Sequence, residues 1–228
     1  MKISHYAYAA VLAALLGSRT EAQVLFYNFN NLSGGTTSAS ESLLNQTPAL
    51  SLSGADLVAA GQAGVAFTDE SGTAHAAGLA AAWTSGIDAP GGNSFRVNLD
   101  TTGYENFVVR YDYRSTSSGS PSAALSYRLG DSGAFTPITS QSFTRDGTFH
   151  STSVDLSALS SIENVSNVSL LWELAPGSGS GTFRVDNLQF SGAAVVPEPR
   201  EYALVAGGAL LLFGVCGRRR RAMAVPTV

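Results

Sequence analysis

YENFVVRYDYR, residues 104–114, alternates apolar and polar side chains along most of its length. In an extended chain, one side would carry Phe107, Val109, Tyr111 and Tyr113. The other side would carry the arginine and the aspartate that separate the last three of these residues. Successive side chains of a strand point to opposite faces, so this period of two is typical of a strand with one buried face. The stretch therefore predicts a long strand that belongs to a sheet with a covered side.

The same alternation recurs in other short segments, namely SFRVNLD (94–100), SAALSYRLG (122–130) and VSLLWEL (168–174). Glycine-rich turn signals separate them, such as GDSG (130–133), RDG (145–147) and PGSGSG (176–181). No stretch has the pattern of the long amphipathic helices that an alternating α/β fold needs. We therefore predict an all-β fold, an antiparallel β-sandwich formed by a single domain over residues 23–193.

The segment GTFRVDNLQFSG (181–192) changes phase in its middle. Phe183 and Val185 are at odd positions, whereas Leu188 and Phe190 are at even ones. One inserted residue moves the following side chains to the other face, so the change predicts a β-bulge at Asp186-Asn187.

The charge of the body excludes one class of partner. Residues 23–196 contain six arginines, no lysine and fourteen aspartates and glutamates, which gives a net charge of −8. Such a surface repels phosphate backbones, so we expect no nucleic acid partner. The single cysteine, Cys216, lies beyond the body, which excludes an intramolecular disulfide and a cysteine-based site in the body.

Candidate catalytic residues are few, and we expect the protein not to be an enzyme. His75 and His150 are far apart and lack a zinc-binding spacing, although a site made of both with a carboxylate stays an open alternative. We expect no cofactor. The alternative is a structural calcium ion with Asp155 or Asp186 among its ligands. The sequence identifies no site for another metal.

The two tryptophans differ as candidates for ligand binding. Trp172 shares its side of the strand with Leu170 and Leu174, which predicts a core position. Trp83 precedes a Thr-Ser-Gly turn signal and is the candidate for an exposed platform that binds a ligand.

Both chain ends carry targeting features. Residues 1–22 have a lysine near the start, an apolar run and small residues before Gln23, as in a secretory signal peptide. Residues 202–217 contain no charge, and Arg218, Arg219, Arg220 and Arg221 follow. A helix over about 200–217 spans a bilayer with little length to spare, and the arginines orient it with the body outside.

The sequence VPEP (196–199), followed by this apolar segment and the arginine cluster, resembles the PEP-CTERM sorting signal of bacterial exosortase substrates. We assign the signal to residues 194–228, with Pro197, Glu198 and Pro199 as the sorting motif. The resemblance implies an exosortase as partner, transient residence in the inner membrane, and then release or attachment at the cell surface or in the extracellular matrix.

The body resembles the sandwich domains of many PEP-CTERM proteins in FTRDGTFHSTSVDLSAL (143–159) and in GTFRVDNLQFSG. Those domains are similar in outline to galactose-binding-like jelly rolls. The expected function is that of an exported, non-enzymatic protein of the cell envelope or extracellular matrix. The alternative is a carbohydrate-binding module for exopolysaccharide.

Overall fold

The computed structural model describes residues 22–33, 36–42, 49–54, 57–69, 72–84 and 92–195. Thr20–Ala194 form one compact unit. The expected signal peptide, the sorting motif, the apolar segment 200–217 and Arg218 to Arg221 lie outside the described residues, apart from Ala22 at the end of the signal peptide. In the part of the chain that is described, no helix has the length and apolar character needed to cross a membrane.

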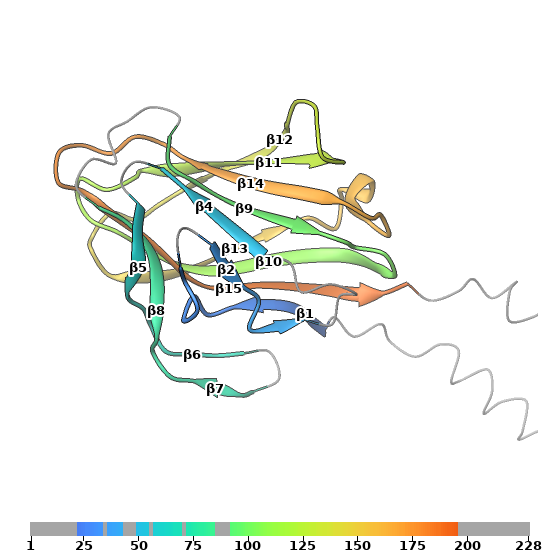
Figure 1. The fold of residues 1–228 in the computed structure, drawn as a ribbon, viewed down its shortest axis with the longest axis horizontal. Helices are drawn as coiled ribbons and strands as arrows, with labels where there is room; N and C mark the ends of the chain where they lie inside the picture. Colours follow the sequence, from blue (N-terminus) through green and yellow to red (C-terminus); the bar gives the residue numbers. More distant parts are fainter. Residues whose placement is uncertain are drawn as a thin grey trace, which may run out of the picture. The chain divides into compact units, whose positions relative to one another are not determined.

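Two antiparallel sheets and a small hairpin make up the fold (Figure 1). The seven-stranded sheet contains β13 (Phe149–Asp155), β10 (Tyr104–Ser115), β15 (Thr182–Ala194), β1 (Ala22–Tyr27), β3 (Glu41–Ser42), β8 (Leu79–Thr84) and β5 (Leu57–Ala63). The six-stranded sheet contains β12 (Thr136–Ser142), β11 (Ser122–Leu129), β14 (Val168–Leu174), β9 (Ser94–Leu99), β4 (Ala49–Ser53) and β2 (Thr36–Ser38). The hairpin pairs β6 (Phe67–Thr68) with β7 (Ala74–His75), and one 3-10 turn covers Ser160–Ile162.

Aromatic rings from the two sheets meet in the core. Phe95 of β9 stacks on Trp172 of β14 at 4.8 Å between ring centroids, and Tyr111 of β10 meets both rings edge-on. All three side chains are almost completely buried. Rings in edge-to-face contact add to the free energy gained from area burial, so this cluster holds the sheets together. The predicted all-β class, the antiparallel sandwich and the core position of Trp172 are confirmed.

A half-buried amide also links the sheets. Gln141 of β12 accepts hydrogen bonds through Oε1 from the Tyr111 hydroxyl (2.6 Å) and from the Trp172 indole N–H (3.3 Å). Its Nε2 donates to Thr152 of β13 at 3.3 Å. Burial without these partners would leave the tyrosine and tryptophan donors unpaired, which costs free energy. Burial also raises the pKa of Tyr111 far above its usual range, so its hydroxyl stays protonated.

Strand β15 is the central strand of the larger sheet and changes partner along one edge. On one side it pairs with β10 over most of its length. On the other side, residues 182–185 pair with β8 and residues 188–192 pair with β1. Asp186 and Asn187 therefore stand at the junction between two strands, and the pairing register with β10 shifts there. The bulge predicted from the phase change is confirmed.

Candidate functional site: a groove on the outer face of the seven-stranded sheet

The bulge in β15 directs two polar side chains against a distant segment. Asn187 has a φ of 50°, a left-handed conformation that asparagine adopts more readily than most residues. The buried Asp186 carboxylate accepts hydrogen bonds from the backbone N–H of Asn187 (2.8 Å) and of Val65 (2.9 Å). Val65 belongs to residues 63–66, which we name the strap.

Two further hydrogen bonds fix the strap to the sheet, and a third joins the bulge to β10. Asn187 Nδ2 donates to the Val65 carbonyl at 3.1 Å and to Asp112 Oδ2 of β10 at 2.7 Å. Arg184 of β15 donates to the Ala63 carbonyl at 2.9 Å. A Cβ added at Gly64 would lie only 2.1 Å from Asp186 Oδ2. Only glycine permits this approach, so the strap, the bulge and β10 form one hydrogen-bonded unit.

Beside the strap lies a groove of about 590 Å³ on the outer face of the sheet. Its floor contains polar side chains of three neighbouring strands, among them Arg110 and Asp112 of β10, Asn187 and Gln189 of β15, and Ser151 and Ser153 of β13. These positions alternate with the buried Val109, Tyr111 and Tyr113, so the period of two that builds the core also builds the groove. Residues Val65 to Thr68 form the wall on the strap side, and Phe149 lines the groove from β13.

The β6–β7 hairpin supports that wall, and Figure 1 shows it outside the sandwich beyond β1. Phe67 stacks on His75 at 4.7 Å between ring centroids, and both rings pack on Phe26 of β1 at 4.9 and 5.1 Å. His75 Nε2 lies 2.9 Å from Asp69 Oδ2, which closes the hairpin. Phe67 is half-buried, so its ring serves both the packing of the hairpin and the groove.

Two carboxylates lie close together at the centre of the site. Burial raises the pKa of Asp186 from 3.8 to about 7, and the charge of the neighbouring Asp112 acts in the same direction. The N–H donors of Val65 and Asn187 oppose this rise, because they stabilise the ionised carboxylate. Asp112 receives hydrogen bonds from Asn187 and from the Ser151 hydroxyl. The acidic groups are thus held by donors that belong to the chain itself.

Trp83 does not provide the exposed platform that the sequence suggested. Its side chain is fully buried, and its indole N–H donates to the carbonyl of Ser53 at 2.9 Å. In β8, Ala80, Ala81, Ala82 and Trp83 are all buried, so both faces of this strand are covered. The turn signal after Trp83 gave no sign of this, because a strand covered on both faces lacks the alternation that marks a surface position.

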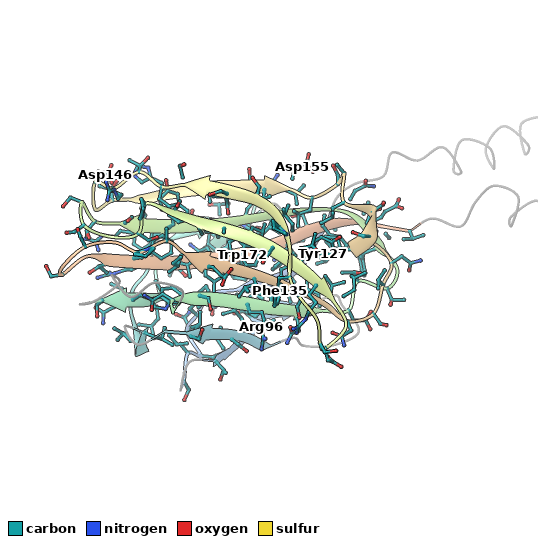
Figure 2. All side chains as sticks on the ribbon, turned by 90° about the horizontal axis from the view of Figure 1, so that it is seen from above. Arg96, Tyr127, Phe135, Asp146, Asp155 and Trp172 are labelled. Carbon is teal, nitrogen blue, oxygen red and sulfur yellow. The ribbon has the colours of Figure 1, made fainter. Side chains whose placement is uncertain are left out.

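The calcium alternative gains no support from clustered carboxylates. Among the described residues, no group of three or more histidine, cysteine, aspartate or glutamate side chains lies close enough to hold a metal ion. Figure 2 shows Asp155 at the end of β13 opposite to Asp146, and Asp155 accepts a hydrogen bond from the Ser157 N–H there. Asp186 is already bonded to two backbone N–H groups.

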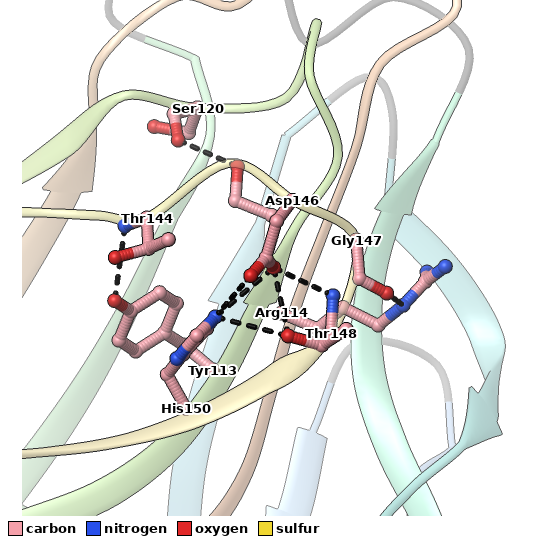
Figure 3. A network of polar contacts seen from close by, with 9 residues as sticks. Tyr113, Arg114, Ser120, Thr144, Asp146, Gly147, Thr148 and His150 are labelled. Carbon is pink, nitrogen blue, oxygen red and sulfur yellow. Dashed lines mark hydrogen bonds and ion pairs between the residues drawn. The ribbon is translucent and has the colours of Figure 1, made fainter.

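His150 takes part in a turn and not in a catalytic relay (Figure 3). Its Nε2 lies 3.0 Å from both Asp146 Oδ1 and Thr148 Oγ1, and Thr148 also donates to Asp146. A nucleophile–base relay needs the nucleophile on one ring nitrogen and the orienting carboxylate on the other. Here the Thr148 hydroxyl and the Asp146 carboxylate both contact Nε2, so the cluster closes the exposed turn between β12 and β13.

Comparison with known proteins finds no matching family model and no matching curated protein. Several solved structures are similar in broad outline. The carbohydrate-binding module TmCBM61 in complex with β-1,4-galactotriose has 9% identity and a TM-score of 0.40, covering 72% of this chain and 92% of that chain. A family 29 carbohydrate-binding module has 10% identity and a TM-score of 0.40, with 75% and 89% covered. The CBM22-1–GH10 modules of Clostridium thermocellum xylanase 10B, complexed with xylohexaose, have 11% identity and a TM-score of 0.44, with 78% and 30% covered. Values of this size identify no ligand.

Proposed function

We propose that the sandwich binds polysaccharide through the outer-face groove and acts as a binding module, not as an enzyme. The observation that carries this proposal is the composition of the groove. Its floor combines guanidinium, carboxylate, amide and hydroxyl groups, and half-buried rings, Phe67 and Phe149, reach it from the strap side and from β13. This is the alternative of the sequence analysis, and the groove favours it over an envelope protein without a ligand.

The chemistry of a sugar chain matches such a groove. Sugar hydroxyls both donate and accept hydrogen bonds, as the amide, carboxylate and guanidinium groups of the floor require. The C–H faces of the sugar ring pack on aromatic side chains, which bury apolar area while one edge stays in water. The volume of about 590 Å³ lies within the range of about 300–1,000 Å³ that small-molecule sites occupy.

Phe149→Ala tests the proposal, with Phe135→Ala as its matched control. Both rings are half-buried, but Phe135 lies on the outer face of the other sheet, against Arg128. Loss of a stacked ring costs about 0.5–1.5 kcal/mol, so Phe149→Ala is expected to weaken polysaccharide binding about two- to thirteenfold. Affinity electrophoresis of purified protein in gels that contain different polysaccharides measures the effect.

Phe135→Ala is expected to leave that binding unchanged. If the protein binds none of a broad polysaccharide panel, or if both variants lose affinity equally, the groove is not a polysaccharide site.

We further propose that the protein is exported and then sorted by an exosortase, and that its sandwich is a jelly roll of the galactose-binding-like type. The sorting proposal is supported by the order of features in the sequence: Pro197, Glu198 and Pro199, then the apolar segment, then Arg218 to Arg221. A polysaccharide-binding domain delivered outside the inner membrane would meet exopolysaccharide at the cell surface or in the extracellular matrix.

Replacing both Pro197 and Pro199 by alanine tests the sorting proposal. We expect the doubly substituted protein to accumulate unprocessed in the inner membrane, as measured by the mass of the protein recovered from membrane and medium fractions. A control with Pro48→Ala and Pro226→Ala changes two prolines outside the motif. Normal processing of the Pro197 and Pro199 variant would contradict the proposal.

A further inference from the structure

We propose that the groove accepts an uncharged sugar unit that donates a hydroxyl group, and that Gln189 is the residue that selects it. This inference rests on the proposed function and adds the class of sugar. It is carried by the position of Gln189, by its unpaired carbonyl oxygen and by the charges around it.

Gln189 lines the groove floor on β15, at the side next to β1. In the sheet it stands between Phe26 of β1 and Arg110 of β10, and its side chain lines the groove. Only 9% of the residue is exposed. Rigid strands on both sides fix its backbone, so only the side chain has to adjust when a ligand arrives.

The Gln189 side chain lacks a hydrogen-bond partner for its carbonyl oxygen. Among the described residues, no donor reaches Oε1, although this atom is shielded from water. A buried acceptor without a donor costs free energy in the unbound protein. Because this oxygen is closed to solvent in the unbound protein, the terminal amide must turn toward the groove before a ligand hydroxyl can donate to it. That hydrogen bond removes the cost on binding, whereas carboxylate, sulfate and phosphate groups have only acceptors to offer.

Rotation of the terminal amide would exchange its oxygen and nitrogen, so the charges around the groove must also be considered. Asp112 lies two residues along β10 from Arg110 and lines the same floor. Arg110 is the single base among the described residues that line the groove. Residues 23–196 add a net charge of −8. A uronate would bring a second carboxylate beside Asp112, which like-charge repulsion disfavours.

The experiment compares neutral and anionic polysaccharides on purified protein. Dextran, xylan and galactan are the neutral probes, and alginate and polygalacturonate are the uronate probes. We expect binding to at least one neutral probe and at least tenfold weaker binding to both uronates at physiological salt. Gln189→Leu is expected to weaken neutral binding about three- to tenfold, the effect of one lost hydrogen bond.

The Tm distinguishes a role of Gln189 in selecting the ligand from a role in stabilising the fold. Leucine fills a similar volume and removes an unpaired buried carbonyl, so the Tm of Gln189→Leu is expected to stay the same or rise. Gln62→Leu is the matched control, since Gln62 lies on β5 outside the groove lining. We expect this control to bind as the unsubstituted protein does.

Two results would overturn the inference while leaving polysaccharide binding intact. One is tight uronate binding that Arg110→Gln abolishes. The other is neutral binding that Gln189→Leu does not change. Failure of every probe to bind would instead overturn the proposed function itself.

Discussion

Asp186 shows how a single buried carboxylate makes the fold sensitive to pH. Burial and the nearby Asp112 raise its pKa to about 7, against 3.8 in an exposed chain. Between these two values the folded protein holds a proton at Asp186 that the unfolded chain has released. The free energy of unfolding therefore falls as pH rises from about 4 to about 7, and the contribution of Asp186 is constant outside this window.

Asp186→Asn is expected to remove this dependence. Asparagine keeps an acceptor for the Val65 N–H and carries no charge, so the variant should gain stability relative to the unsubstituted protein as pH rises from 4.5 to 7.5. Urea unfolding at both pH values measures the difference. Asp155→Asn is the control, because the Ser157 hydrogen bonds lower the pKa of Asp155 and move its titration below the window. Equal slopes for the unsubstituted protein and Asp186→Asn would refute the assignment.

At the scale of elements, the strap and the β15 bulge depend on each other. The bulge turns Asp186 and Asn187 toward the strap, and the strap supplies the N–H and carbonyl groups that these side chains bond. Because β1 ends and β8 begins at this point along the edge of β15, the strap also covers the junction between them. The wall of the groove is therefore positioned by a register shift in a strand far away in the sequence.

Gly64→Ala is expected to separate the strap from the bulge. The added Cβ would lie 2.1 Å from Asp186 Oδ2, so the strap must move, with a cost of about 1–3 kcal/mol that is typical of overpacking. We expect polysaccharide binding to fall more than Tm alone explains, because the groove wall shifts. Isothermal titration well below the Tm measures the affinity.

Gly130→Ala is the comparison for that substitution. Its φ is 77°, so alanine strains the backbone there, but the added Cβ meets no atom within 4 Å and lies far from the groove lining. It should lower Tm and leave affinity unchanged. Unchanged affinity in Gly64→Ala would show that the strap does not position the groove wall.

The elements were more predictable than the site that they build. The period of two located β9, β10, β11 and β14, and the phase change located the bulge, because both are properties of neighbouring residues. The groove joins the segment around Val65 to residues near 110 and 187, and no local pattern connects them. Trp83 was misplaced for a related reason, since the burial of β8 on both faces depends on strands elsewhere in the chain.

At the scale of the whole molecule, charge is separated along the chain. The body carries a net charge of −8, and the whole chain carries −4, because arginines are concentrated after residue 196. The acidic body disfavours anionic polymers through long-range repulsion, an effect that salt weakens. Discrimination between neutral and uronate polysaccharides should therefore be greatest at low ionic strength.

The pairing of β1 with β15 also decides when the domain can form. Strand β1 is the first described element and β15 the last, yet Leu25 pairs with Phe190 and Phe26 with Gln189. Among the described strands, the first strand pairs only with two residues of β3 until residues near 190 have left the ribosome. Pairings between such distant residues form slowly, since a large loop must close, at a cost in entropy, before any contact stabilises it. Synthesis thus leaves a long interval in which the sheet stays open and the groove floor, which requires β15, does not exist.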